Sequence, residues 1–305
     1  MDDIRRFHST LPVLVFNFKK LSNEKNSLPS DQLNVLFEDS KGNFWIGSDN
    51  GLFVFDESKK SFKIFKNSFE DSNSIKHNSI TSIVEDNEEN LWVGTFGGGL
   101  NKLEIATGKV ERINSDSSVF TDFIHTILPI TDESLLVGTS GSGLLLFNKK
   151  SKEFIEFFNA SLNFSEEVKI VRKLFRDSKG NVWVGTDGDG LIKIEFENNT
   201  WLKPKNYSYK KHVESSLSGN AIYEIMEDDA FNIWIGTAWN GINILEKESD
   251  YEFFFSDIKG GHPAPVLSIY KNTDYLFFGL DGKGLTVYEL DSDNVALFSE
   301  DFNTA

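Results

Sequence analysis

This sequence contains a pattern that is repeated several times along the chain. Side chains suited to ligand binding occur at two fixed places in that pattern. One place is the second and third positions of a short apolar segment, and the other is a glycine-rich turn that follows a Trp-bearing segment. The candidate ligand-binding residues are Asn34, Asn50, Phe96, His125, Arg172, Asp187, Tyr223, Glu224, Trp239, Asn240 and Asp281. Aromatic rings stack on the C–H faces of sugars, while amides, carboxylates and guanidinium groups bond to hydroxyls. This mixture favours a neutral, polyhydroxylated ligand.

Motifs for other chemistries are missing or incomplete. The five histidines form no His-Glu-x-x-His zinc pattern, and no Gly-x-x-x-x-Gly-Lys-Ser/Thr phosphate loop occurs. The stretch from Asp187 to Gly190 lacks the ligand spacing of a calcium loop, so we interpret it as a glycine turn. We therefore predict no catalytic residue, no metal ligand and no cofactor. A pair of carboxylates for glycoside hydrolysis, with one member from each of two repeats, stays compatible with the sequence, because pairing across blades cannot be read from it.

The repeated pattern consists of an acidic pair, a tight turn, a Trp-bearing segment and a glycine turn. Its copies are centred near Trp45, Trp92, Leu136, Trp183, Trp234 and Phe277. The glycine that ends the Trp-bearing segment recurs 43 to 51 residues apart, as Gly47, Gly94, Gly138, Gly185, Gly236 and Gly279. A repeat of this length, built only from strand-like segments, is typical of β-propeller blades.

Each repeat contains four segments with the short apolar pattern of β-strands. In the first repeat they cover residues 33–38, 44–48, 52–55 and 62–65. The sequence therefore predicts an all-β fold, a β-propeller of four-stranded antiparallel blades with six full repeats. The first strand of each blade is expected to line the central channel, so the candidate residues would surround one mouth of that channel.

The phase of the repeat sets the predicted domain boundaries. Residues 12–18 align with the fourth strand of a blade, so we predict one N-terminal strand of a seventh blade, with the rest of that blade beyond Ala305. The predicted parts are an extension at 1–11, a single propeller at 12–299 and a C-terminal end at 300–305. We expect the chain to be a fragment, or the first part of a longer protein. Six blades that do not close would expose two apolar faces.

Residues that recur in every repeat are expected to be structural. The first and fourth positions of the first strand are always aliphatic, and we predict that inner strands are buried on both faces. The tryptophans are predicted to lie between blades, and the glycines to permit close backbone approach. Function is expected where the repeats differ, at the candidate residues. The alternative is that each candidate is a solvated residue of a polar turn.

The overall composition excludes several classes of partner. The chain has 305 residues, a net charge of −16 and no cysteine. An acidic surface repels phosphate backbones and anionic lipids, so this segment is not expected to contact nucleic acid or membrane. The apolar run at 11–18 is interrupted by Asn17 and followed by Lys19 and Lys20, which favours a strand over a secretory signal.

The repeated phrase Asp-x-x-Gly-Asn-hydrophobic-Trp-hydrophobic-Gly-Thr-x-x-Gly-Gly-Leu resembles the two-component regulator propeller repeat. The resemblance extends from about residue 13 to 298; it is strong at Trp45, Trp92, Trp183 and Trp234, and weak at Leu136 and Phe277. That family forms the periplasmic sensor region of bacterial hybrid two-component regulators, in which two seven-bladed propellers precede a β-sandwich, a membrane span and a histidine kinase. Because the motif residues are structural, the resemblance assigns no ligand-binding residue.

The resemblance implies a ligand-sensing propeller, non-enzymatic in itself, that binds an oligosaccharide in the periplasm and passes the signal to a histidine kinase outside this chain. Expected partners are further propeller and signalling domains of the same receptor, and a homodimer is compatible with this arrangement. Two alternatives stay open. One is a propeller enzyme of the streptogramin-lyase or lactonase kind, for which His125 is the histidine at the mouth. The other is a protein-interaction scaffold.

Overall fold

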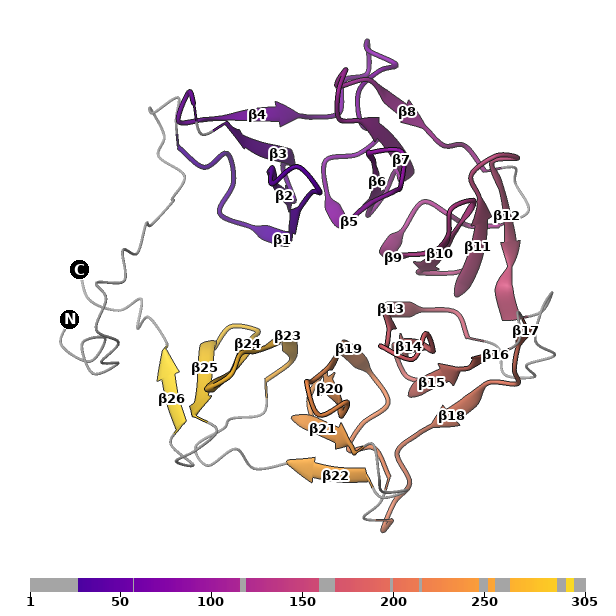
Figure 1. Ribbon diagram of the computed structural model, residues 1–305, viewed down its shortest axis with the longest axis vertical. Helices are drawn as coiled ribbons and strands as arrows, with labels where there is room; N and C mark the ends of the chain where they lie inside the picture. The colour runs from indigo at the N-terminus through magenta and orange to yellow at the C-terminus, as the bar shows by residue number, and fades with distance from the viewer. Residues whose placement is uncertain are drawn as a thin grey trace.

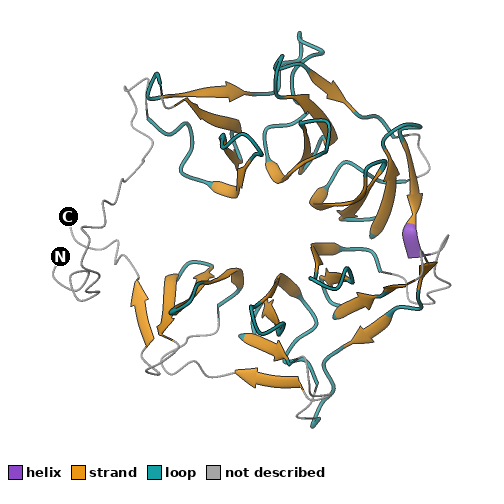
Figure 2. Ribbon diagram, in the orientation of Figure 1, coloured by secondary structure: helices purple, strands orange, loops and turns teal. Residues whose placement is uncertain are grey.

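The computed structural model describes residues 27–56, 58–115, 119–158, 168–197, 200–213, 216–246, 252–255, 264–289 and 295–298. These residues form strands and turns, with one helical turn at 157–158 (Figure 2). Six four-stranded antiparallel sheets follow one another around a ring, and each runs from an innermost to an outermost strand (Figure 1). The predicted propeller of six full repeats is therefore confirmed. The strand predicted at 12–18 lies outside the described residues.

The strands of each blade are given in order from the centre outwards. The first three blades comprise β1 (Leu33–Glu38), β2 (Phe44–Ser48), β3 (Gly51–Asp56), β4 (Ser61–Phe65); β5 (Ile80–Glu85), β6 (Asn90–Thr95), β7 (Gly99–Glu104), β8 (Val110–Arg112); and β9 (Ile124–Thr131), β10 (Ser134–Thr139), β11 (Leu144–Asn148), β12 (Glu153–Glu156). The last three comprise β13 (Val171–Arg176), β14 (Val182–Thr186), β15 (Leu191–Ile194), β18 (Lys205–Tyr207); β19 (Ile222–Glu227), β20 (Ile233–Thr237), β21 (Ile242–Leu245), β22 (Glu252–Phe255); and β23 (Val266–Lys271), β24 (Tyr275–Leu280), β25 (Gly284–Glu289), β26 (Val295–Phe298). An extra hairpin, β16 (Phe196–Glu197) and β17 (Thr200–Trp201), separates β15 from β18.

The hydrophobic core lies between neighbouring blades. Trp92 of β6 is 2% exposed and packs against the third blade, where its ring centroid lies 5.3 Å from that of Phe147. Comparable clusters of buried residues join the first blade to the second, the third to the fourth, the fourth to the fifth and the fifth to the sixth. The predicted position of the tryptophans is confirmed, and burying such large rings stabilises each junction strongly.

The glycine that ends each second strand leaves room for the next blade. A Cβ on Gly94 would lie 2.7 Å from Cγ2 of Ile124, the first residue of β9. The same relation joins Gly47 to Ile80, Gly138 to Val171, Gly185 to Ile222 and Gly236 to Val266. The inner strands β5, β9, β13, β19 and β23 therefore each begin with an aliphatic side chain that packs onto the bare backbone of the preceding blade, which is the close approach predicted from the sequence.

The first and sixth blades each present one face that no other described blade covers. Leu33 and Leu36 of β1 are 41% and 57% exposed, whereas Ile80 and Ile83 at the same positions of β5 are 0% and 4% exposed. In the sixth blade, Tyr270 of β23 is 63% exposed. The prediction that inner strands are buried on both faces is therefore wrong for β1 and β23, because each has a described neighbour on one side only.

Candidate functional site

The turns between the second and third strands share one backbone geometry. The first residue of each turn donates its N–H, over 2.8–3.3 Å, to the carbonyl of the residue that precedes the inner strand. The pairs are Asp49 with Gln32, Phe96 with Ser79, Ser140 with Phe123, Asp187 with Ile170, Ala238 with Ala221, and Asp281 with Pro265. Side chains at these positions therefore project from equivalent places around the ring, and the backbone does not dictate their type.

An aromatic group forms where the turn of the second blade meets the third blade. The ring of Phe96, which is 39% exposed, lies 4.7 Å from that of Phe123 and 5.4 Å from that of His125, measured between centroids. Phe120 continues the group, 5.5 Å from Phe123. Nε2 of His125 lies 2.8 Å from Oγ of Ser140. The result is a partly exposed aromatic surface next to a hydrogen-bonding pair.

The imidazole of His125 is uncharged at neutral pH. Burial, and after it the positive charge of Arg172, lower the pKa of His125 to about 4, while Asp187 acts in the opposite direction. A neutral imidazole offers one donor and one acceptor and stacks as an aromatic ring. His125 therefore extends the aromatic surface without adding charge.

Charged side chains continue the same line across the fourth and fifth blades. Nε of Arg172 donates to Oδ2 of Asp187 at 2.9 Å, and the guanidinium carbon lies 5.4 Å from the ring centroid of Tyr223. Nζ of Lys173 lies 2.7 Å from Oε1 of Glu224. We call this set the mouth arc: Phe96, His125, Arg172, Asp187, Tyr223 and Glu224. The six candidate residues come from four consecutive blades. Phe96 contacts His125, Arg172 contacts Asp187 and Tyr223, and Glu224 pairs with Lys173, the neighbour of Arg172 on β13.

The candidates of the first blade serve their own blade junction. Nδ2 of Asn34 donates to Oδ1 of Asp49 at 2.8 Å and to the carbonyl of Ile80 at 3.0 Å. Nδ2 of Asn50 donates to the carbonyl of Pro29 at 3.3 Å. These contacts hold turns in place, and neither amide has a described contact with the mouth arc.

The three remaining candidates have no described contact with the mouth arc. Nδ2 of Asn240 donates to the carbonyl of Ser218 at 2.8 Å, which ties its turn to the connection that leads into β19. Trp239 is 65% exposed, and Asp281 is exposed. Sequence reasoning did not select Phe120 and Phe123, although two aromatic residues just before an inner strand were an available signal.

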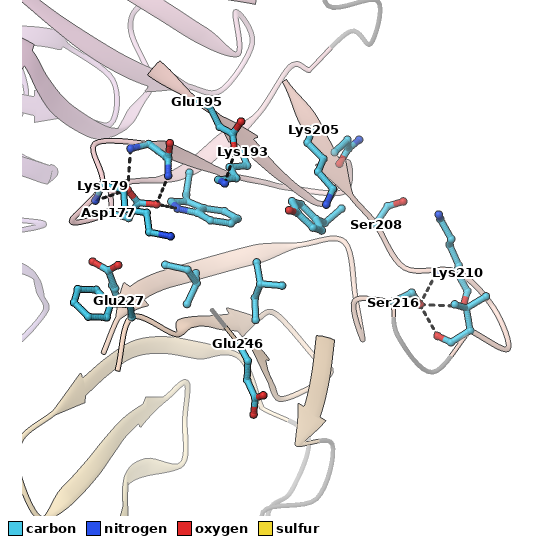
Figure 3. A pocket seen from close by; sticks show the side chains of 18 residues that line it. Asp177, Lys179, Lys193, Glu195, Lys205, Ser208, Lys210, Ser216, Glu227 and Glu246 are labelled. Carbon is cyan, nitrogen blue, oxygen red and sulfur yellow. Dashed lines mark hydrogen bonds and ion pairs between the residues drawn. The ribbon is translucent and has the colours of Figure 1, made fainter. Parts of the chain in front are cut away.

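A separate cavity of about 580 Å³ lies between the fourth and fifth blades, beside β18 (Figure 3). Its lining includes Trp183 and Tyr207, whose ring centroids are 6.0 Å apart, and Nζ of Lys193 lies 5.5 Å from the ring centroid of Trp183. The sequence did not predict this cavity, because it depends on where β18 runs after the extra hairpin.

Two observations bear on metal binding and membrane insertion. In the described ranges, no group of three or more His, Cys, Asp or Glu side chains could hold a metal ion. None of the helical structure in those ranges is long and apolar enough to cross a membrane.

Three segments match the family model of the two component regulator propeller, at residues 27–50, 74–97 and 167–188. Each covers the approach to an inner strand, that strand, the Trp-bearing strand and the start of the turn that follows. At these three segments the chain is similar to the two component regulator propeller. In addition, a stretch of 76 residues is 33% identical to histidine kinase P4 of Formosa agariphila, which corresponds to 25% of this chain and 6% of that protein.

Solved structures share the fold of these repeats. The extracellular domain of a proposed one component system from B. thetaiotaomicron has a TM-score of 0.69 and 21% identity, over 90% of this chain and 37% of that chain. The extracellular domain of a proposed hybrid two component system from the same organism has a TM-score of 0.65 and 21% identity, over 92% and 42%. The chain therefore spans less than half the length of these structures.

Proposed function

We propose that this propeller is the ligand-sensing segment of a two-component signalling receptor and that its mouth arc binds an oligosaccharide. The observation that carries the proposal is a row of aromatic and charged side chains across four blades: Phe96 lies against His125, the charge of Arg172 lowers the pKa of His125, and Arg172 lies against Tyr223. The repeat fixes the backbone at these positions but does not require their side chains. Partly exposed rings offer stacking surfaces, and the guanidinium and carboxylate groups offer directed hydrogen bonds to hydroxyls.

The proposal puts the propeller in the periplasm, as part of a membrane-anchored receptor whose histidine kinase lies outside this chain. It is supported by the family match, by the extracellular domains that share the fold and by the short similarity to a histidine kinase. In this account the propeller itself is not an enzyme. It binds the ligand on a rigid scaffold and passes the signal to the following domains.

A thermal-unfolding assay with plant, host and microbial oligosaccharides tests the proposal. A ligand at about 100 times its dissociation constant stabilises the folded state by about 2.7 kcal/mol, so one glycan class should raise Tm selectively. The Arg172→Ala variant should lose this rise, and the Lys205→Ala variant, changed beside the separate cavity, should keep it. A rise that persists in Arg172→Ala, or a panel without any rise, would contradict the proposal.

A further inference from the structure

The connection that leads into β5 folds around a guanidinium group. Oγ of Ser74 donates to the carbonyl oxygens of Ser68 and Asp71, at 3.0 and 2.7 Å. Arg112, on the outer strand β8, donates from Nε to the carbonyl of Ser74 at 2.8 Å, and from Nη2 to the carbonyls of Ser68 at 3.0 Å and Asp71 at 2.9 Å. We call these three carbonyls the first cup. Charge-assisted bonds from one arginine fill it.

The connection that leads into β19 repeats the same network. Oγ of Ser216 donates to the carbonyl oxygens of Lys210 and Val213, at 3.1 and 2.8 Å. The N–H of Lys210 donates to Oγ of Ser216 at 2.9 Å, just as the N–H of Ser68 donates to Oγ of Ser74 at 2.8 Å. Lys210, Val213 and Ser216 hold the positions that Ser68, Asp71 and Ser74 hold in the first network, and we call their three carbonyls the second cup.

No guanidinium group of this chain takes the place of Arg112 in the second cup, as far as the described residues show. Arg112 pairs with Asn101 across β7 and β8, and the residue that pairs with the equivalent Asn243 is Phe254, whose side chain has no hydrogen-bond donor. Asn101 and Asn243 are equivalent because they make the same bond. Oδ1 of Asn101 accepts from the N–H of Lys76, in the connection that leads into β5, and Oδ1 of Asn243 accepts from the N–H of Ser218, in the connection that leads into β19.

The second cup has one backbone hydrogen bond that the first cup lacks among the described contacts. The N–H of Val213 donates to the carbonyl of Lys210 at 3.1 Å, a bond with no described counterpart in the first cup. The bond occupies part of the acceptor capacity of the Lys210 carbonyl. In the first cup, the corresponding carbonyl of Ser68 accepts from Arg112. In the described part of the chain, no basic side chain donates to the carbonyls of Val213 or Ser216.

The second cup opens onto the cavity of about 580 Å³ described above. Lys210, Val213 and Ser216 belong to the lining of that cavity, and Lys210 and Ser216 lie at one end of it (Figure 3). A cavity of this size accommodates a side chain or a small molecule. The lining carries four carboxylates and four ammonium groups, those of Asp177, Glu195, Glu227 and Glu246 and of Lys179, Lys193, Lys205 and Lys210. The lining charges therefore balance, and it is the net charge of −16 of the whole chain that favours a cation.

We propose that the second cup binds a guanidinium group, supplied from outside this chain's described strands. Three converging carbonyls suit the planar, multiple-donor fork of a guanidinium group better than the single point charge of an ammonium group. The first cup shows that this backbone arrangement accepts a guanidinium group when the edge strand provides one. The site is independent of the mouth arc and goes beyond the proposed function.

Nuclear magnetic resonance of the 15N-labelled 305-residue chain tests the second cup. The probe is a peptide with the sequence of residues 108–114, which carries Arg112 in its natural context, and matched peptides carry lysine or citrulline at that position. We expect saturable shifts of the amides of Tyr209, Lys210 and Ser216 with the arginine peptide. Binding of the lysine peptide should be at least about tenfold weaker, and the uncharged citrulline peptide should not bind.

Variants of both cups separate binding from non-specific effects. Ser216→Ala removes the hydroxyl that ties the second cup together and should abolish the shifts, whereas Ser208→Ala, in the same cavity lining, should retain them. Arg112→Ala empties the first cup and should add a second set of shifts at Ser68 and Ser74. The proposal is overturned if the arginine peptide gives no saturable shift around Ser216, or if the citrulline peptide binds equally well.

A further titration with argininamide identifies the source of the guanidinium group. Affinity for the peptide above that for argininamide indicates an arginine side chain on a polypeptide segment that lies along the outer strand of the fifth blade. Equal affinity indicates a small guanidinium compound as the ligand. Both results support a guanidinium site. The proposal is contradicted if neither the arginine peptide nor argininamide gives saturable shifts.

Discussion

A single carboxylate organises the tight turn at the end of the second inner strand. Asp86, which is buried, accepts hydrogen bonds from the indole of Trp92 at 2.7 Å and from the N–H of Asn90 at 3.0 Å. Burial acts to raise the pKa of Asp86, but these bonds and the nearby Lys149 outweigh it and hold the pKa below its ordinary value. The same aspartate–indole bond recurs at Trp45, Trp183 and Trp234.

We predict that Asp86→Asn destabilises the protein by roughly 2–3 kcal/mol, because the amide replaces a charged acceptor of several hydrogen bonds in a buried position. Chemical denaturation should show a lower midpoint. The control is Asp274→Asn, at an exposed turn position, which should change the free energy of unfolding by less than about 0.5 kcal/mol. Equal effects of the two substitutions would contradict the structural role of the Asp86 carboxylate.

His125 makes stability depend on pH. Its pKa is about 4 in the folded protein and about 6.5 when unfolded, so the unfolded chain binds more protons between these values. Stability is therefore fully present above pH 6.5 and falls as the pH drops towards 4, by an amount on the order of 3 kcal/mol. His125→Asn should flatten the stability profile in this window. An unchanged slope in the variant would show that other groups cause the loss.

At the scale of the strands, the blades are held together by glycines that receive side chains from the next blade. We predict that Gly94→Ala costs about 1–3 kcal/mol, because the new methyl group would meet Ile124 at 2.7 Å and Ile127 at 3.2 Å. The matched change is Gly279→Ala, at the same position of the sixth blade. There the nearest atom is Oγ of Ser268, which can rotate away, so we expect a smaller loss. Thermal unfolding of both variants measures the difference.

The sequence predicted the regular strands well. In the first blade, the expected segments 33–38 and 44–48 coincide with β1 and β2, because short apolar runs bounded by Gly, Asn and Asp leave few alternatives. The hairpin formed by β16 and β17 was not predicted. Its strands contain two residues each, and it is stabilised by the packing of Trp201 against Phe196 and Phe157, which no local pattern reveals.

At the scale of the whole molecule, the ends of the blade series differ from its middle. We predict that Leu36→Ala, on the uncovered face of β1, changes the free energy of unfolding by less than about 0.5 kcal/mol. Ile83→Ala, at the same position of β5, should cost about 2–5 kcal/mol, because it leaves a cavity between two blades. Comparable losses in both variants, measured by denaturant titration, would show that the face of β1 is covered in solution.

The candidate site was predictable only in part. The sequence placed the variable positions on inner strands and turns, and in the structure Phe96 contacts His125 there, while Arg172 contacts Asp187 and Tyr223. Asn34, Asn50 and Asn240 occupy similar positions but bond to nearby turns or backbone carbonyls. A repeat pattern cannot separate these outcomes, because it fixes where a side chain starts and not which partner it reaches.

Calorimetric titration with the most stabilising glycan tests whether the mouth arc binds an oligosaccharide. We expect saturable binding by the unaltered chain and a loss of affinity of about tenfold or more in Arg172→Ala, because a charge-assisted hydrogen bond to the ligand is removed. Tyr209→Ala, an exposed aromatic residue outside the arc, should bind as the unaltered chain does. Unchanged affinity in Arg172→Ala would contradict the claim.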